Sequence, residues 1–186
     1  MSDVVLLIVL LVAELVFRLF VEIRERRITQ LRGGAFAVLR LIPLVNDIVP
    51  LPESRKAPAE SDFVKAHEFG HRDLHHSVLR NLVKIVFLIL ALWFFTFMLN
   101  RCGQPLLLAV LWLHLAAIPF RIFFHWYCWT QEYEADHYAF KQVGRQKTKE
   151  AMRNLVECEI VYSRFFALMY REHPTALMRR IKLLGK

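Results

Sequence analysis

The residues best suited to chemistry form the segment His67-Glu68-Phe69-Gly70-His71, which is an H-E-x-x-H pattern. If this segment is helical, His67 and His71 lie one turn apart on the same face, so both imidazoles can bind one zinc ion. Glu68 then lies beside them, where it can take a proton from a water molecule held at that ion. The pattern is short enough to occur by chance, so its context decides whether it is a metal site.

The segment Glu132-Tyr133-Glu134-Ala135-Asp136 offers the carboxylate that would complete a His-His-Glu set of ligands. Glu132 and Asp136 are four positions apart, so a helix that brings Glu132 to the metal also brings Asp136 to the back of a ligand histidine. There Asp136 would orient the histidine ring. Glu134 points to another side of that helix and is expected to be solvated or paired, so we favour Glu132 as the third ligand.

The residues around the H-E-x-x-H pattern exclude two other classes of zinc protease. A metzincin would need glycine and histidine at the positions where this chain has Leu74 and Ser77. A site-2-type intramembrane protease carries its pattern inside an apolar span, whereas polar residues flank the pattern here. The gluzincins, which take a glutamate from a later helix, remain.

Two further motifs follow the H-E-x-x-H pattern along the chain. His76 follows the H-E-x-x-H pattern, and His173-Pro174 is followed by Arg179 near the C-terminal end. Together with Glu132-x-x-Ala135-Asp136, and in this order, these motifs resemble those of the integral-membrane gluzincins, the family of the type I CAAX prenyl proteases and the bacterial HtpX heat-shock proteases. The resemblance covers roughly residues 60–186. The family usually has more membrane before the metal helix, whereas this chain has one convincing span there.

The resemblance assigns a role to each of these residues. It implies that His67, His71 and Glu132 bind one zinc ion and leave a fourth position for water or the scissile carbonyl. Glu68 would be the general base. His173 and Arg179 would steady the oxyanion of the tetrahedral intermediate, and the alternative for them is a capping or phosphate-facing pair. Asp136 and His76 would stand behind the ligands as second-shell residues.

Three apolar blocks approach the length of a membrane span, and the chain is 56% hydrophobic. We expect spans at about residues 4–22, 82–99 and 105–124. The first lacks a basic start and a cleavage site, so we expect it to be retained. It contains Glu14 and Arg18, whose spacing allows an ion pair on one helix face. The predicted fold is all-α: a single domain over 1–186, formed by a polytopic membrane helical bundle around the H-E-x-x-H core.

Local signals predict the helices that position the motifs. Ser61 is expected to cap a helix over 63–79 that holds the H-E-x-x-H pattern and continues into the second span. A helix over 130–140 holds the second motif, and Gly144 interrupts it. Further helices are expected over 148–171, with an apolar stripe, and over 176–184. The apolar stretch 35–51 is either interfacial or forms strands, and its role stays open.

The net charge of +8 follows membrane topology rather than nucleic-acid binding, which we exclude. Of the 25 Lys and Arg residues, 11 fall within 21–84 and 12 within 121–186, whereas the turn between the second and third spans holds only Arg101. By the positive-inside rule, both long polar segments are cytoplasmic. The three cysteines show no C-x-x-C spacing, so they predict neither a disulfide framework nor a thiolate zinc site.

These patterns predict an integral, multi-pass membrane protein whose active site is on the cytoplasmic side of a bacterial inner membrane or its equivalent. Its activity would be that of a zinc metalloendopeptidase that cleaves membrane-associated, lipidated or misfolded polypeptides by attack of zinc-activated water. Its partners would be the lipid bilayer and the polypeptide substrate; the sequence defines no oligomeric state. The alternative is a non-catalytic membrane protein with a structural or sensing zinc site, against which the intact Glu68 argues.

Overall fold

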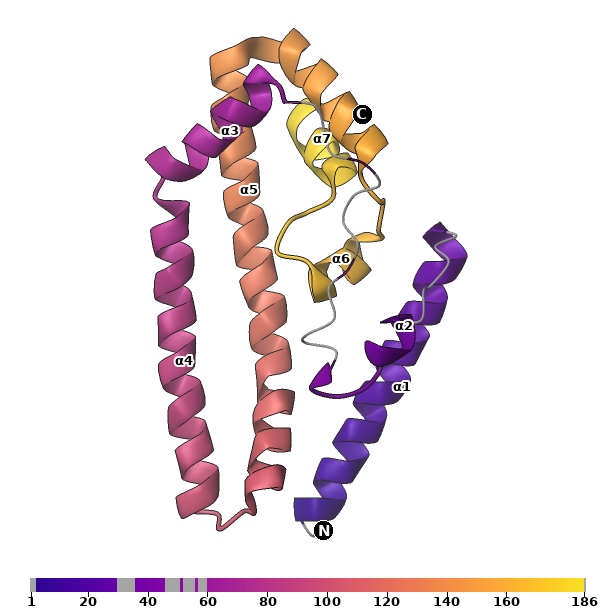
Figure 1. Cartoon of the computed structure of the whole chain (residues 1–186), viewed down its shortest axis with the longest axis vertical. Helices are drawn as coiled ribbons and strands as arrows, with labels where there is room; N and C mark the ends of the chain where they lie inside the picture. The colour runs from indigo at the N-terminus through magenta and orange to yellow at the C-terminus, as the bar shows by residue number, and fades with distance from the viewer. Residues whose placement is uncertain (1–2, 30–35, 46–50, 52–55, 57–59, 186) are drawn as a thin grey trace. The chain divides into compact units, whose positions relative to one another are not determined.

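The part of the chain that the structure describes is mostly helical. In this computed structural model the described residues are 3–29, 36–45, 51, 56 and 60–185. Their helices are α1 (Asp3–Thr29), α2 (Phe36–Leu39), α3 (Asp62–Asp73), α4 (His76–Asn100), α5 (Leu106–Cys158), α6 (Arg164–Tyr170) and α7 (Ala176–Leu184) (Figure 1). No strand occurs within these ranges, so the predicted all-α fold is confirmed. The possible strands of 35–51 fall partly outside the described residues, and α2 lies in the part that is described.

Three of the described helices are long and apolar enough to cross a membrane. They cover Asp3–Ile28, His76–Asn100 and Leu106–Cys158, the last being far longer than one span. The expected spans at 4–22, 82–99 and 105–124 fall on these helices.

The helices group into two compact units. The first contains residues 1–50 and 84–121, and the second contains residues 51–83 and 122–186. The expectation of a single domain stays a prediction.

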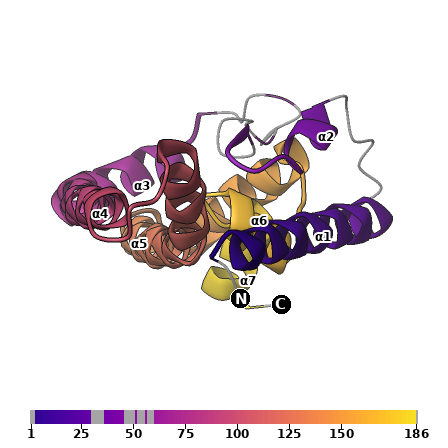
Figure 2. The same ribbon diagram turned by 90° about the horizontal axis from the view of Figure 1, so that it is seen from below.

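In the first unit, α4 and the start of α5 lie side by side and are joined by a short turn (Figure 2). Phe87 of α4 stacks on Phe120 of α5 with ring centroids 3.5 Å apart. Near the turn, Gln104 donates a hydrogen bond to Asp3 at the start of α1 over 3.4 Å. Most other large apolar side chains of α4 are exposed, as expected for a surface that faces lipid.

A face of α1 in the first unit buries charged residues. Arg18 donates to Glu14 over 2.7 Å, which confirms the predicted pair, and His114 of α5 lies 2.9 Å from the same carboxylate. Further along, Arg40 donates to Glu22 over 2.7 Å. Charged groups in apolar surroundings are costly unless they are paired, so these contacts fix which face of α1 packs inward.

The second unit begins with the helix that carries the H-E-x-x-H pattern. Ser61 caps α3 as predicted, because its hydroxyl accepts a hydrogen bond from the backbone N–H of Val64. The helix ends at Asp73, so the prediction that it continues into the second span is wrong. His75 has a left-handed backbone, with φ of 56°, and this conformation ends α3 and starts α4 in a new direction.

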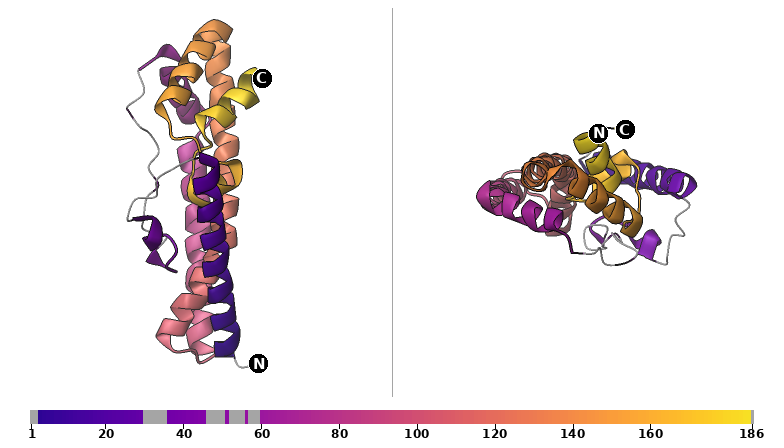
Figure 3. Two further views of the ribbon diagram at one scale, coloured as in Figure 1. Left: turned by 90° about the vertical axis from the view of Figure 1, so that its right-hand side faces the viewer. Right: turned by 90° about the horizontal axis from the view of Figure 1, so that it is seen from above.

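Helix α5 reverses direction within the second unit, as Figure 3 shows. The reversal occurs at Gly144, whose φ of 80° and ψ of 171° are accessible mainly to glycine, so the predicted interruption is confirmed. The single helix predicted over 148–171 is wrong, because α5 ends at Cys158 and α6 starts only at Arg164. The short helix over 176–184 is confirmed as α7.

Contacts of Glu159 explain why the chain leaves the helix after Cys158. The Glu159 carboxylate accepts a hydrogen bond from Arg171 over 2.7 Å and another from the backbone N–H of Ala176. The second contact satisfies a free N–H group at the start of α7, which Thr175 also caps. Glu159 therefore fixes the segment that carries the third motif.

The hydrophobic core of the second unit joins α3 to both arms of α5. Phe63 of α3 packs with Ala139 from the arm before Gly144 and with Ala151 and Met152 from the arm after it. Leu183 and Leu184 of α7 pack against this cluster. Full burial of a side chain of the size of Phe63 contributes about 1.5–3 kcal/mol, so this core supports the helices that carry the motifs.

Candidate metal centre

Helix α3 presents two histidines on one face. The Nε2 atoms of His67 and His71 lie 3.1 Å apart, and their rings meet edge to face with centroids separated by 4.6 Å. His67 is buried and His71 is partly buried. The four-residue spacing therefore brings the two ring nitrogens together, as the helical pattern predicts.

Glu132 of α5 completes the group. Its carboxylate is buried, with Oε2 3.4 Å from Nε2 of His67 and Oε1 3.2 Å from Nε2 of His71. Donor atoms at the corners of a tetrahedron with metal–nitrogen bonds of about 2.0–2.1 Å are separated by about 3.3 Å. The two Nε2 atoms, 3.1 Å apart, lie close to that value, and each faces one of the two Glu132 oxygens, at 3.4 Å for His67 and 3.2 Å for His71. The donor set and its spacing therefore fit a tetrahedral zinc ion.

Gly70 allows α3 to approach α5 closely enough for this arrangement. A Cβ atom at position 70 would lie 3.2 Å from Cα of Ala135 and 3.2 Å from Cβ of Tyr138. Glycine in the first motif and alanine in the second thus face each other where the two helices meet. Because Gly70 lies between the two histidines and Ala135 between Glu132 and Asp136, this contact sets the distance between the ligands.

Asp136 lies directly behind His67. Its Oδ1 is 3.0 Å from Nδ1 of His67, and Arg179 of α7 donates to the same carboxylate through Nε at 2.9 Å and Nη2 at 2.5 Å. Burial alone would raise the pKa of Asp136, but the hydrogen bonds from Arg179 and His67 outweigh it and lower that pKa. An ionised Asp136 accepts the Nδ1 proton of His67 and leaves Nε2 free for a metal.

The Glu132 carboxylate is surrounded by donors. Arg80 of α4 donates to it through Nη2 over 2.8 Å, and Nδ1 of His173 lies 3.0 Å from Oε1. Burial would raise the pKa of Glu132, yet the hydrogen bonds with His173, His67 and His71 lower it far below its usual value. Glu132 is therefore anionic, as a zinc ligand must be.

Sequence reasoning missed Arg80. Besides Glu132, Arg80 holds Gln131 through a hydrogen bond of 2.6 Å from Nε. Arg80 lies one helical turn after His76, so the two side chains share one face of α4. This four-residue spacing was the signal in the sequence that could have placed Arg80 near the centre. That signal is weak, because basic residues near the end of a span are common for topological reasons.

His76 contacts the other ligand histidine. Its Nδ1 is 2.8 Å from Nδ1 of His71, and its Nε2 is 3.2 Å from Oε2 of Glu134. Glu134 is therefore paired with a histidine. His75, next in sequence, is exposed in the turn between α3 and α4 and lines no part of the centre.

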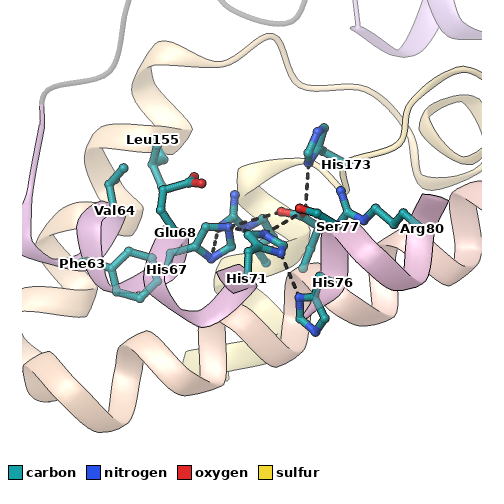
Figure 4. A pocket seen from close by; sticks show the side chains of 12 residues that line it. Phe63, Val64, His67, Glu68, His71, His76, Ser77, Arg80, Leu155 and His173 are labelled. Atoms are coloured by element: carbon teal, nitrogen blue, oxygen red, sulfur yellow. Dashed lines mark hydrogen bonds and ion pairs between the residues drawn. The ribbon is translucent and has the colours of Figure 1, made fainter. Parts of the chain in front are cut away.

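A cavity of about 360 Å³ opens beside these residues (Figure 4). Glu68 and His173 lie on the same side of the histidine pair in that view. The structure brings together all eight residues singled out from the sequence, with Asp136 behind His67 and the other seven lining the cavity. The lining consists of Phe63, Val64, His67, Glu68, His71, His76, Ser77, Arg80, Glu132, Leu155, His173 and Arg179.

The helical fold and the His-His-Glu group beside Glu68 define the class of H-E-x-x-H metallopeptidases that take their third ligand from a later helix. The model of peptidase family M48 matches residues 29–186, and the chain therefore belongs to this family of CAAX-protease- and HtpX-type membrane zinc metalloproteases. No curated protein and no solved structure matches the chain. Membership confirms the resemblance that the motifs carry and makes the chain a metallopeptidase.

Proposed function

We propose that this protein is a membrane-embedded zinc metalloendopeptidase that hydrolyses peptide bonds of membrane-associated, lipidated or misfolded polypeptides. The observation that carries the proposal is the grouping of His67, His71 and Glu132, which can each offer one ligand atom within 4.8 Å of the other two. Glu68 follows His67 directly and lines the adjoining cavity. A site for a metal, a base and an opening for substrate therefore adjoin one another.

In this proposal His67, His71 and Glu132 hold the ion. When bound, zinc supplies Lewis-acid chemistry, which polarises a carbonyl and lowers the pKa of water. Glu68 accepts the proton of the attacking water and later gives it to the leaving amine. Its exposed carboxylate can reach a substrate in the cavity without first leaving a buried partner. Asp136 keeps the Nδ1 proton on His67 throughout.

His173 and Arg179 differ in how accessible they are to a substrate. The His173 side chain is 46% exposed and lines the cavity, so it can donate a hydrogen bond to the oxyanion that develops on the carbonyl. Arg179 also lines the cavity, but two of its nitrogens bind Asp136. Besides the oxyanion role that the family resemblance suggests, Arg179 therefore acts by holding Asp136 against His67.

The proposed substrates follow from the position of the site along the chain. His71 is five residues before the first residue of α4, which is long and apolar enough to cross a membrane. A site so close to a candidate span meets polypeptides at the bilayer surface. Because Lys and Arg concentrate in 21–84 and 121–186, we place that surface on the cytoplasmic side.

Replacing Glu68 by Gln tests the mechanism. We expect purified Glu68→Gln in detergent to keep its zinc and to lose peptide hydrolysis by about 10²–10⁴-fold, because the amide cannot accept the proton of water. Glu150→Gln, an exposed change on α5 outside the cavity, is the matched control and should leave activity unchanged. Full activity of Glu68→Gln with zinc retained would refute the proposed mechanism.

A further inference from the structure

His76 lies between a proposed metal ligand and a carboxylate at the protein surface. Its Nδ1 is 2.8 Å from Nδ1 of His71, and its Nε2 is 3.2 Å from Oε2 of Glu134. The His76 side chain is only 2% exposed, whereas that of Glu134 is 64% exposed. A buried imidazole thus connects the ring of His71 to a carboxylate in contact with solvent.

The turn between α3 and α4 makes this contact possible. In an uninterrupted helix, a residue five positions after His71 would point about 140° away from it, because each residue advances about 100°. The left-handed backbone of His75, with φ of 56°, breaks the helix and lets His76 face His71. Helix α4 then starts with His76 as its first residue.

Only one arrangement of protons satisfies both contacts when Nε2 of His71 binds a metal. A neutral imidazole has one donor and one acceptor nitrogen, so His71 carries its proton on Nδ1 and donates it to His76. Nδ1 of His76 accepts, and the His76 proton therefore lies on Nε2. From there His76 donates to the Glu134 carboxylate, so each donor in the series faces an acceptor.

The two ligand histidines are then supported in different ways. His67 contacts the buried carboxylate of Asp136 directly, and Arg179 fixes that carboxylate with two hydrogen bonds. His71 reaches a carboxylate only through His76, and that carboxylate is exposed. The indirect contact of His71 with Glu134 transmits less negative charge to the ligand than a direct carboxylate does, and water can compete for the exposed carboxylate.

We propose that Glu134 and His76 form a carboxylate–histidine relay that fixes the proton and the ring orientation of His71 for metal binding. The relay rests on the proposed function, because it takes His71 as a zinc ligand. Glu134 and His76 are positioning residues, because they act on the metal only through His71. The relay gives Glu134 a role at the metal centre, although Glu134 and Glu132 point to different sides of α5.

Zinc affinity of the full chain in detergent, measured by competition with a chromophoric chelator, tests the relay. His76→Leu removes the acceptor and the donor and should weaken zinc binding about 10–100-fold. His76→Asn keeps a side-chain oxygen that can accept from His71, so it should lose less than His76→Leu. Glu134→Gln keeps an acceptor without the charge and should weaken binding severalfold, up to about tenfold.

Two controls match these variants. His75→Asn changes the neighbouring exposed histidine to a residue that tolerates a left-handed backbone, and Glu150→Gln changes an exposed glutamate on α5. Both should bind zinc as the wild type does. Glu134 is largely exposed, so Glu134→Gln keeps the test decisive even if His76→Leu fails to fold.

Nitrogen NMR of histidine-labelled, zinc-loaded protein gives a second readout that a packing role would not produce. We expect the proton of His71 on Nδ1 and that of His76 on Nε2. A proton on Nδ1 of His76, or zinc affinities of Glu134→Gln and His76→Leu within twofold of the wild type, would overturn the relay alone. A wild-type protein that binds no zinc would instead overturn the proposed function, and the relay with it.

Discussion

Single hydrogen bonds decide which nitrogen of each histidine is free to bind a metal. Asp136 is ionised, because Arg179 and His67 lower the pKa of its carboxyl against the effect of burial, and it therefore accepts the Nδ1 proton of His67. Glu132 is anionic for a similar reason, with donors on His173, His67 and His71. The charges at the centre are thus set by contacts between side chains that come from α3, α4, α5, α7 and the segment before α7.

Replacing Asp136 by Asn tests this support at the scale of one residue. The amide has the same shape but lacks the charge, so it holds the Nδ1 proton of His67 less firmly and leaves the partly buried Arg179 without its carboxylate. We expect zinc affinity to fall about 10–100-fold and the thermal unfolding temperature to drop. Asp62→Asn, at an exposed aspartate of α3 that pairs with Lys147 over 2.6 Å, should leave zinc affinity unchanged and lower the unfolding temperature less than Asp136→Asn. Zinc affinity of Asp136→Asn within twofold of the wild type would show that this carboxylate does not support the ligand.

Helical spacing explains which contacts between side chains of the site could be predicted from the sequence. His67 with His71, and Glu132 with Asp136, are each four positions apart, and that spacing alone puts both members of a pair on one face. Arg80 and Glu134 were not assigned to the centre, because their contacts depend on how α4 leaves the turn at His75. The sequence contains no periodic signal for a histidine with a positive φ.

Between helices, the contact of Gly70 of α3 with Ala135 of α5 holds the proposed ligands at their spacing. A Cβ atom at position 70 would meet Ala135 and Tyr138 at 3.2 Å, which is tighter than most Cβ contacts in proteins. A larger side chain there requires Ala135 or Tyr138 to shift, and we expect a bulky one to push the two helices apart. Because His67 and His71 flank Gly70 in sequence, such a shift would also move them away from Glu132.

We expect Gly70→Val to destabilise the protein by about 1–3 kcal/mol through overpacking and to weaken zinc binding as well. Gly70→Ala should have a smaller effect, because its gain in helix propensity of about 1 kcal/mol opposes the close contact. Chemical denaturation and chelator competition measure the two effects. Lys65→Val is the control, since it puts the same side chain at an exposed position of α3. If Gly70→Val and Lys65→Val behave alike, the close approach of the two helices is unimportant.

The helix boundaries show what local sequence does and does not determine. Ser61 as a cap, Gly144 as an interruption and α7 are confirmed, because each depends on a local signal such as a hydroxyl cap or a positive φ. The end of α5 at Cys158 was not predicted. Glu159 leaves the helix to bind Arg171 and the start of α7, and no periodic pattern reveals a contact between segments that are distant along the chain.

In the whole molecule, the side of the membrane on which the site lies depends on the arrangement of the candidate spans. Candidate spans occur in α1, α4 and α5, and the basic residues concentrate in the long polar segments. The proposed topology puts residues 101–105, between α4 and α5, on the face opposite the zinc site. Those residues include Cys102, which is exposed, whereas Cys128 and Cys158 are buried.

Cys102 makes the topology measurable in the native sequence. We expect a membrane-impermeant maleimide to label Cys102 in intact cells or spheroplasts, and to label it in everted vesicles only after they are permeabilised. The Cys102→Ser variant should lose this labelling, because the other two cysteines are buried. Labelling of Cys102 in sealed everted vesicles, without permeabilisation, would put the zinc site on the opposite side from the one proposed.

The zinc content of purified Glu132→Gln, compared with the wild type and with Glu134→Gln, decides the claim that His67, His71 and Glu132 bind zinc. We expect one zinc ion per chain in the wild type and in Glu134→Gln at saturating zinc, and loss of tight binding in Glu132→Gln, because Glu132 is the proposed third ligand beside His67 and His71. A wild type without zinc, or a Glu132→Gln variant that binds it as tightly as the wild type, would contradict the claim.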